Sequence, residues 1–305
     1  GHMDTVFPDG TAEKRPFRIE GENYYGPGVG DMKNGDLAMF HIAANLPETE
    51  EKCLNIAMVY NPDEEIGSIY SKEITDRIGC QADHIFVMES AGKNGTRHCF
   101  ARKGSLTYDI EFQGQAAHAG FMFEVENASA VLEMGHYIVE LMSLADREKD
   151  TTVNVGIANG GTARNVVADH AKISVEMRFR DDSERIRLKE YVNKITEGQP
   201  FVPGVKTTIT MQKETPPFIK TEEAKKYIER VRKIAEEHGI PFEEKDRGGL
   251  SDANHLSRCG KAIVMDGMGP HGANDHSEKE YGYIGSVEPC VKLHLAILND
   301  MLNKQ

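Results

Sequence analysis

The pattern of apolar and polar positions changes its period several times along the chain. Short apolar runs between polar residues predict buried strands at 53–60 (CLNIAMVY) and 84–88 (HIFVM). Between them, residues 66–78 have the spacing of a helix. The apolar face of that helix would consist of Ile66, Ile69, Tyr70 and Ile74. Strands that alternate with helices are typical of an α/β fold with a mixed, mainly parallel sheet and flanking helices.

A different pattern begins near residue 102. Residues 105–113 (SLTYDIEFQ) alternate apolar and polar side chains, as in a strand with one exposed face. A helix, two strands, a helix and a final strand are predicted to follow, at 126–146, 152–158, 171–179, 183–197 and 205–211. This β-α-β-β-α-β order is typical of a ferredoxin-like domain.

The alternating pattern resumes beyond Thr215-Pro216-Pro217, which we interpret as a hinge. A charged amphipathic helix over 222–238, a buried strand over 262–266 and a closing helix over 286–302 are predicted there. The alternation of strands and helices seen before residue 102 is therefore found again after residue 215. We expect a discontinuous first domain, 1–101 and 215–305, with an inserted second domain, 102–214.

The composition narrows the class of protein. The 305 residues include 36 Lys and Arg against 49 Asp and Glu, and this net charge of −13 argues against nucleic acid or an anionic membrane as a partner. No apolar run approaches the roughly 18 residues of a membrane-spanning helix. The five cysteines form no CxxC pair, which favours free thiols in a reducing compartment over a zinc–thiolate site. We therefore expect a cytoplasmic protein, although a signal upstream of Gly1 would not be visible.

Acidic residues and histidines gather at the ends of apolar segments and in glycine-rich turns. They are His2, Asp4, Asp31, Glu64, Glu65, Glu89 and His276. In an open α/β sheet, ligands bind at the carboxyl ends of the strands. Two histidines with several carboxylates suit Zn²⁺ or a similar ion in a hydrolytic site, and two-metal hydrolases share a carboxylate between their ions. Taken singly, each of these residues is interpreted more simply as a solvated or core residue.

Nine segments, in matching order and spacing, carry a resemblance to a known family. They are GHMDTVFP, YGPGVGDMKNG, DEEIGS, VMES, GQAAHAG, GGTARNVV, EMRFR, GGLSDANH and DHSEKEY. The chain resembles the zinc-dependent metallopeptidase family of carboxypeptidase G, acetylornithine deacetylase, succinyl-diaminopimelate desuccinylase and aminoacylase, and above all its carboxypeptidase G-like branch. The resemblance spans residues 1–281 and implies a zinc-peptidase-like catalytic domain with an inserted dimerisation domain.

The resemblance implies a ligand set for two Zn²⁺ ions per chain. His2 would bind one ion together with Glu89, and His276 would bind the other together with Glu65. Asp31 would bridge the two ions. Co²⁺ or Mn²⁺ would fit the same ligands.

Further residues would serve the chemistry. Asp4, two residues after His2, would orient that imidazole. Glu64 would be the general base that takes a proton from the metal-bridging water and then protonates the leaving amine. The peptide bond after Asp31 would be cis, as it commonly is in the family. His118 would hold the oxyanion in a neighbouring subunit's active site, which implies a homodimer; without the resemblance, it is a polar residue at a strand-to-loop junction.

Other matching segments imply contacts with substrate. Arg178 would bind the free carboxylate, which suits the bidentate fork of arginine. The alternative is an exposed strand position, paired with Glu176 or Asp181. Asn165 would contact a carboxylate or carbonyl group. The substrate cleft would be shaped by Gly249, Ser251 and Asp252.

These residues predict a di-zinc hydrolase that cleaves an amide bond adjacent to a free carboxylate. The substrates left open are small peptides, a folate-like N-acyl glutamate, N-acyl amino acids and the tripeptides of an aminopeptidase. The alternative class is a catalytically silent relative that binds peptides or acts as a dimeric scaffold, but such a protein would be expected to lose Glu64 or Asp31. A calcium-binding module is disfavoured because the chain has no DxDxDG loop.

The family has more chain ahead of the segment that matches GHMDT. Because DTVFP continues the motif beyond Gly1-His2-Met3, we expect an omitted upstream part rather than an expression scar that coincides with the motif. That part would contribute strands to the sheet of the first domain.

Overall fold

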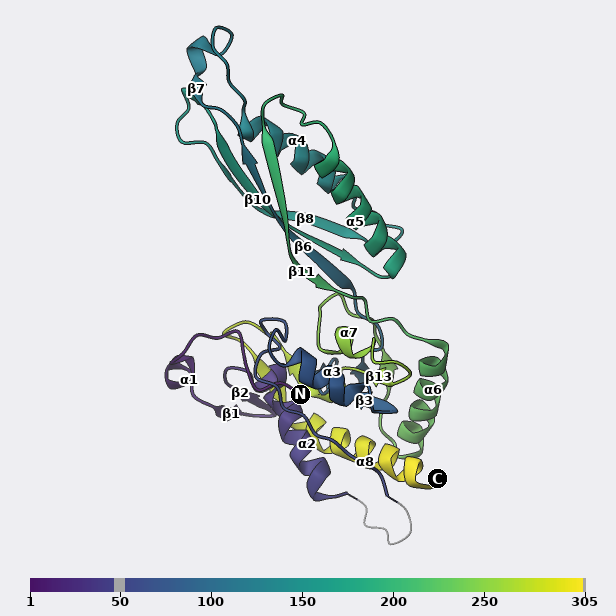
Figure 1. The fold of residues 1–305 in the computed structure, drawn as a ribbon. Helices are drawn as coiled ribbons and strands as arrows, with labels where there is room; N and C mark the ends of the chain where they lie inside the picture. Colours follow the sequence, from purple (N-terminus) through teal and green to yellow (C-terminus); the bar gives the residue numbers. More distant parts are fainter. Residues whose placement is uncertain (47–52, 304–305) are drawn as a thin grey trace. The chain divides into compact units, whose positions relative to one another are not determined.

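The computed structural model describes residues 1–46 and 53–303. The chain divides into two compact units. The first joins Gly1–Arg102 with Phe218–Gln305, and the second is the single stretch Lys103–Pro217. Both units combine helices with strands, which confirms the α/β class (Figure 1).

The first unit contains a five-stranded sheet with the order β1-β2-β15-β14-β4. Its strands are β1 (Arg18–Glu20), β2 (Asn23–Tyr25), β15 (Tyr281–Tyr283), β14 (Gly269–Ala273) and β4 (Ser90–Ala91). Only β14 and β4 pair in parallel in this sheet. Two further parallel pairs are β13 (Ile263–Met265) with β3 (His84–Phe86), and β12 (Glu243–Glu244) with β5 (Arg97–His98). The pairing is therefore mixed, and its antiparallel part includes strands without an apolar signature, since β1 is exposed along its length.

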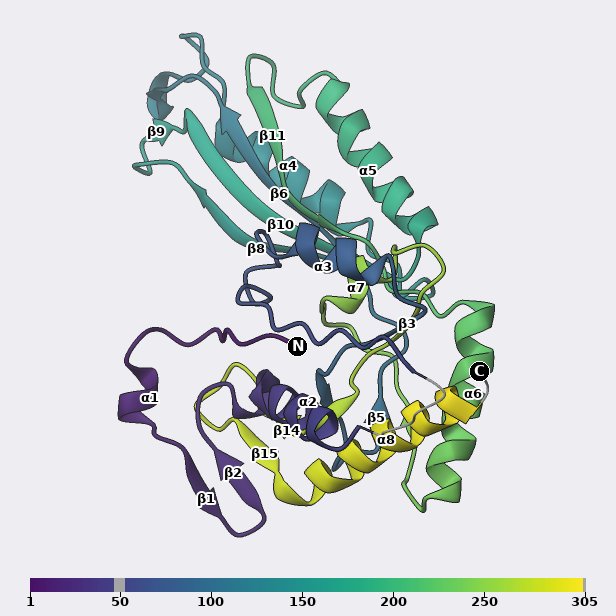
Figure 2. The same cartoon turned by 60° about the horizontal axis from the view of Figure 1, so that its bottom comes forward.

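Three helices pack around the core of this unit. They are α2 (Asn34–Ala44), α6 (Glu222–Glu237) and α8 (Val287–Asn303), and Figure 2 shows α8 running beside α2 and α6. Buried side chains such as Ala38, Val231 and Leu293 meet in one apolar cluster. Full burial of a large apolar side chain contributes about 1.5–3 kcal/mol, so this cluster stabilises the packing of the three helices. The shorter helices are α1 (Thr11–Lys14), α3 (Lys72–Gly79) and α7 (Ala253–Leu256).

Four of the elements predicted for this unit are confirmed, but the strand at 53–60 is not. The predictions at 84–88, 222–238, 262–266 and 286–302 correspond to β3, α6, β13 and α8. Residues 53–60 have no regular secondary structure and none of them is buried, and residues 53–59 line a groove of about 800 Å³. Both the predicted strand and its predicted burial depend on a neighbouring segment, which the apolar run itself does not specify.

The predicted helix over 66–78 is wrong in its first half and in the face that it buries. Its first residues form turns in which Ser68 has a φ of 54°. The Asp63 carboxylate accepts hydrogen bonds from the N–H groups of Tyr70 (2.7 Å) and Ser71 (3.1 Å), which stabilises these turns before α3 begins. The exposed residues include the whole predicted apolar face, Ile66, Ile69, Tyr70 and Ile74.

The second unit is a four-stranded antiparallel sheet with two helices on one face (Figures 1 and 2). Its longer elements in chain order are β6 (Gly104–Gln113), α4 (Ala130–Met142), β8 (Thr152–Gly160), β10 (His170–Phe179), α5 (Asp182–Glu197) and β11 (Lys206–Thr215). All six elements predicted over this stretch are confirmed. The sheet order is β11-β6-β10-β8, and the register places Ile110 opposite both Ile173 and Ile209.

The two helices of this unit begin at side-chain caps. Ser129 accepts a hydrogen bond from the N–H of Leu132 at the start of α4, and Asp181 does the same for Glu184 in α5. Leu141 and Leu188 then pack from the helices against the sheet. Among the described residues of the whole chain, no helix is long and apolar enough to cross a membrane.

Candidate metal centre

Asp31 lies in a glycine-rich loop that leads into α2. The loop ends in a π-helical turn, η1 (Val29–Lys33). Gly28 has a φ of 72°, and a Cβ at this position would lie 2.2 Å from Cγ2 of Thr5, so a side chain does not fit. The Asp31–Met32 peptide bond is cis, as the resemblance implied.

Glu280 is a residue of this site that the sequence analysis missed. Its side chain is 1% exposed and accepts hydrogen bonds from the N–H groups of Gly28 (2.9 Å), Gly30 (2.8 Å) and Asp31 (3.0 Å). It thereby positions the backbone that carries Asp31. The only signal in the sequence is its place four residues after His276 in a charged stretch, where a glutamate is usually solvated.

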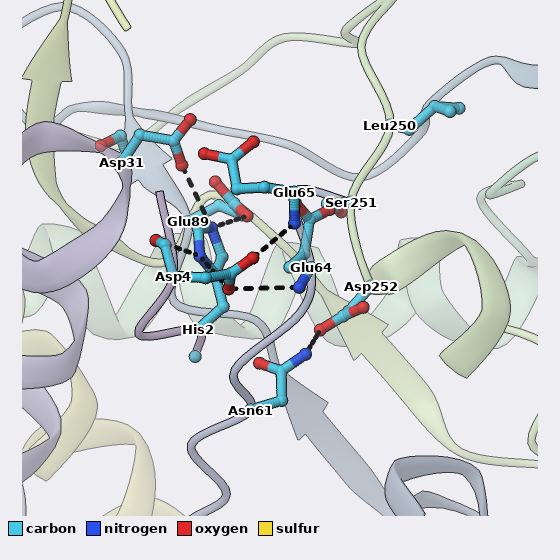
Figure 3. Close-up of polar contacts among 12 residues, drawn as sticks. His2, Asp4, Asp31, Asn61, Glu64, Glu65, Glu89, Leu250, Ser251 and Asp252 are labelled. Carbon is cyan, nitrogen blue, oxygen red and sulfur yellow. Dashed lines mark hydrogen bonds and ion pairs between the residues drawn. The ribbon is translucent and has the colours of Figure 1, made fainter. Parts of the chain in front are cut away.

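The Asp31 carboxylate lies between two histidines. Its Oδ1 is 3.2 Å from Nε2 of His2, and its Oδ2 is 3.1 Å from Nε2 of His276. Glu89 lies 3.5 Å from the same nitrogen of His2, and Glu65 lies 3.2 Å from that of His276. The structure therefore brings the five predicted ligands together. Figure 3 shows the carboxylates of Asp31, Glu65 and Glu89 near the His2 ring.

Asp4 connects His2 with the Glu64-Glu65 segment (Figure 3). Its Oδ1 is 3.3 Å from Nδ1 of His2. Its two oxygens accept hydrogen bonds from the N–H groups of Glu64 (3.2 Å) and Glu65 (2.9 Å). A β-bridge between His2 and Asn61 holds the same two segments. One carboxylate therefore positions an imidazole and two glutamates.

Burial and crowding of carboxylates perturb the ionisation of the site. Burial, and then the charge of Glu89, raises the pKa of Glu64 to about 9. Burial and the charge of Asp31 raise the pKa of Glu65 to about 7. Burial favours neutral His2, but hydrogen bonds with Asp31 and Glu89 raise its pKa to about 12. These shifts report an excess of negative charge in a buried place, which divalent cations would balance.

The donor atoms also fit such cations. The ligand atoms of His2, Asp31 and Glu65 lie within 4.8 Å of one another, and so do those of His2, Glu64 and Glu89. Imidazole nitrogen combined with carboxylate oxygen suits zinc, cobalt or manganese. Because Glu64 lies as close as the predicted ligands do, distance alone does not separate a general base from a ligand.

Asp252 lies in a polar network that supports the segment after Glu64. Its carboxylate accepts hydrogen bonds from Nδ2 of Asn61 (2.8 Å) and Oγ of Ser68 (2.5 Å). Nε2 of His255 lies 3.0 Å from the same carboxylate. Figure 3 shows the Asn61–Asp252 contact beside Glu64.

A buried ion pair anchors the segment of Gly249 and Ser251. The Oγ of Ser251 donates to Asp266 at 2.8 Å, and the Arg102 guanidinium pairs with the same carboxylate. Arg102 also donates from Nη1 to the carbonyl of Leu250 at 3.1 Å. These contacts engage the Ser251 side chain within the protein. Its predicted role in shaping the substrate cleft would therefore depend on where the backbone of this segment lies.

Two predicted residues lie side by side in the second unit. His118 ends β7 (Ala117–His118), which pairs with β9 (Val166–Val167). Its side chain is exposed, and its Nδ1 accepts a hydrogen bond from the N–H of Gly120 at 3.1 Å. The carbonyl of Asn165 accepts the N–H of Ala119 at 2.9 Å, directly after His118.

Arg178 lies on β10 of the second unit. Its Nη2 is 2.8 Å from Oε1 of Glu176, which is one of the two pairings that the alternative interpretation named. The arginine side chain is half-buried. Its contact with a substrate carboxylate stays a prediction.

Comparison with known proteins places the chain in a family. The model of peptidase family M20/M25/M40 matches residues 1–300. Carboxypeptidase G2 from a Pseudomonas species is 26% identical over 304 residues, which cover 98% of this chain and 72% of that protein. A succinyl-diaminopimelate desuccinylase from Halorhodospira halophila is 24% identical over 321 residues, which cover 99% of this chain and 82% of that protein.

Solved structures show the same fold. A tripeptidase from Staphylococcus aureus has a TM-score of 0.81 and 22% identity, with 100% of this chain and 80% of that chain covered. The family match extends over nearly the whole chain, and the named relatives agree with the family that the motifs suggested. The chain is therefore a hydrolase that belongs to peptidase family M20/M25/M40.

Proposed function

We propose that the protein is a two-metal hydrolase that cleaves an amide bond adjacent to a free carboxylate. The observation that carries this proposal is the position of Asp31, whose two oxygens lie 3.2 and 3.1 Å from Nε2 of His2 and of His276. Glu89 would complete the ligands on the His2 side, and Glu65 those on the His276 side. Two Zn²⁺ ions held there, or Co²⁺ or Mn²⁺, would polarise the scissile carbonyl and acidify a water molecule.

Glu64 is the proposed proton carrier. With burial and Glu89 acting on it, its pKa is raised to about 9. Nearby cations lower the pKa of a carboxyl group, which brings Glu64 toward the range in which it accepts a proton at neutral pH and returns it to the leaving amine. Asp4 supports this role, because it binds the backbone N–H of Glu64 and contacts His2 at the same time.

The proposed substrates are small peptides or N-acyl amino acids with a free carboxylate. Among the relatives are proteins named carboxypeptidase G2 and succinyl-diaminopimelate desuccinylase, which supports an amide substrate with an acidic end. Arg178 would bind the carboxylate through its planar guanidinium group, and Asn165 would contact a carboxylate or carbonyl. Gly249, Ser251 and Asp252 would shape the cleft. With five cysteines that are all free, we place this activity in the reducing cytoplasm.

Mass-spectrometric product analysis on a mixed panel tests the proposal. The panel holds N-acyl amino acids, di- and tripeptides and a folate-like acyl glutamate, each with added Zn²⁺. We expect release of a free C-terminal amino acid, and a loss of at least about 100-fold in turnover in Glu64→Ala with metal content unchanged. Glu73→Ala, at an exposed position of α3, is the matched control and should turn over normally.

Three outcomes would contradict the proposal or a part of it. Release of only the N-terminal residue from tripeptides would indicate an aminopeptidase. No release by protein that contains its full complement of metal would favour the catalytically silent scaffold. Full turnover by Glu64→Ala would remove Glu64 as the base.

We further propose that the second unit is a ferredoxin-like dimerisation domain whose His118 completes the site of the partner subunit. In its support, β8 is an edge strand and carries Ile157, which is 56% exposed. On α4, the exposed Leu132 and Val139 lie seven residues apart and therefore on one face. Open strand edges and apolar patches of this kind are usually covered by a partner.

Complementation between two inactive variants tests this arrangement. When His118→Ala and Glu64→Ala chains are co-expressed, we expect up to about a quarter of wild-type turnover, because half of randomly paired dimers are mixed and each has one complete site. Ile157→Asp should shift the protein toward a monomer in light scattering. Ile186→Asp, at a similarly exposed isoleucine of α5, should not. If the mixed dimers have no activity, His118 does not act across subunits.

A further inference from the structure

Two cysteines from distant parts of the sequence meet in the first unit. The sulfur atoms of Cys80 and Cys259 are 2.7 Å apart. Cys80 caps the C-terminal end of α3, and Cys259 follows α7. Gly79 permits this approach, because a Cβ there would lie 2.9 Å from Cδ2 of Leu256 and 3.5 Å from the Cys259 sulfur. The backbone of α3 therefore passes directly against the segment that carries Cys259.

The contact between the sulfur atoms is reinforced by polar bonds on both sides. Asp76 of α3 lies 2.6 Å from Nδ1 of His255 in α7. The carbonyl of Asp76 accepts the N–H of Cys80 at 2.8 Å and also lies 3.4 Å from the sulfur of Cys259. These bonds hold the two helix ends together without any link between the thiols.

We propose that Cys80 and Cys259 are a redox-reversible thiol pair that closes into a disulfide and staples α3 to the segment after α7. An S–S bond is about 2.05 Å long, so closure requires only a small movement of the sulfur atoms. The two thiols differ in access, since Cys80 is exposed and Cys259 is 3% exposed. Cys80 therefore meets the oxidant, and Cys259 resolves the product.

Hydrogen peroxide is a sufficient oxidant for this step. The Cys80 sulfur attacks one peroxide oxygen, the O–O bond breaks, and a sulfenic acid and one water are formed. The Cys259 sulfur then attacks the sulfur of that sulfenic acid, the S–S bond forms, and the oxygen leaves as a second water. In sum, two thiols lose two hydrogen atoms, and one peroxide becomes two waters. A dithiol reductant reverses the link by thiol–disulfide exchange.

A disulfide between Cys80 and Cys259 would increase the stability of the folded protein. A disulfide between these positions closes a loop of about 180 residues in the unfolded chain, and long loops give the larger entropic stabilisation. We therefore expect the melting temperature to rise by about 5 °C on oxidation. Neither sulfur belongs to the carboxylate cluster around Asp31, so this proposal can be tested independently of the proposed hydrolase activity.

Peroxide treatment of the full chain, followed by thiol alkylation and peptide mass analysis, tests the proposal. We expect a cross-linked peptide that joins Cys80 and Cys259 and lacks two hydrogen atoms, a higher melting temperature, and reversal of both by dithiothreitol. Cys80→Ser should abolish the cross-link and the gain in melting temperature. Cys53→Ser is the matched control, because Cys53 is also exposed, and it should keep both.

Three results would overturn the proposal. The first is oxidation of Cys80 to sulfinic acid while Cys259 can still be alkylated. The second is a preferred link between Cys80 and Cys53. The third is a Cys80–Cys259 link that leaves the melting temperature unchanged. Because Cys80 is exposed, its replacement by serine should not prevent folding, and the comparison does not depend on a variant at the buried Cys259.

Discussion

The buried carboxylate of Glu280 holds the backbone on which Asp31 depends. Its removal would leave the N–H groups of Gly28, Gly30 and Asp31 without their acceptor. Each buried donor left unpaired costs about 1–3 kcal/mol. We therefore expect Glu280→Ala to lower the free energy of unfolding by about 3 kcal/mol and to weaken metal binding. Chemical denaturation and a metal titration would measure the two effects.

Two further variants separate positioning from general damage. Glu280→Gln keeps one oxygen for the donors of Gly30 and Asp31, but its NH₂ group would face the N–H of Gly28, so we expect an intermediate loss. Glu278→Ala, at an exposed position in the same stretch, should change neither stability nor metal affinity. Wild-type metal affinity in Glu280→Ala would show that these hydrogen bonds do not position Asp31.

At the scale of residues, the sequence was most informative where chemistry restricts the residue type. Motifs at both ends of the chain predicted His2, Asp31 and His276 as neighbours, and the structure brings them together. Glu280 was missed because its partners are backbone N–H groups, which leave no pattern of side chains. Arg178 contacts Glu176 in the structure. Its predicted contact with substrate stays a prediction, because the pattern of residues does not specify the ligand.

Among the helices, α5 has a buried acidic residue, Glu184, in its first turn. Hydrogen bonds from Arg187 lower the pKa of Glu184 to about 2, and hydrogen bonds from Lys149 and Thr151 act in the same direction. Burial of the carboxylate opposes this shift. The folded pKa is thus below its ordinary value of 4.5. The charged carboxylate therefore stabilises the fold above pH 4.5, and this stabilisation is lost as the pH falls toward 2.

Glu184→Gln should consequently destabilise the protein in a pH-dependent way. We expect the free energy of unfolding to fall by about 2 kcal/mol at pH 7. This value allows for solvent screening, because the Arg187 and Lys149 side chains are partly exposed. The difference in unfolding free energy between variant and wild type should shrink below pH 4.5. Urea denaturation at a series of pH values measures it. Glu190→Gln, at an exposed position of the same helix, is the control. A cost independent of pH would mean that Glu184 acts through packing rather than charge.

Among the elements, predictability followed length in the second unit but not throughout the first, where the eleven-residue α2 was not predicted and the three-residue β3 and β13 were. The long helices α4, α5, α6 and α8 and the ten-residue strands of the second unit carry many periods of their pattern and were predicted. Strands of two or three residues, such as β1 and β4, depend on pairing with distant segments and have too few positions to show a period. The turns before α3 are stabilised by Asp63, whose carboxylate accepts hydrogen bonds from the N–H groups of Tyr70 and Ser71, and the helical spacing of the residues does not show these bonds.

At the scale of the molecule, the metal site couples chemistry to stability. Burial first, and repulsion between neighbouring carboxylates second, raise the pKa values of Glu64, Glu65 and Glu89, and bound cations would offset both effects. Ions that bind only the folded state stabilise it by about 2.7 kcal/mol at one hundred times their Kd. We expect the melting temperature of the metal-free protein to rise by several degrees when Zn²⁺ is added.

Asp31→Asn provides the decisive comparison, because asparagine has the same shape but removes the charge between the two histidines. We expect this variant to lose both ions together on dialysis and to show no rise in melting temperature with Zn²⁺. Asp36→Asn, also buried but outside the ligand groups, should keep the rise. If Asp31→Asn retained two ions by elemental analysis, the carboxylate could not be their bridge, and the two-metal proposal would need another shared ligand.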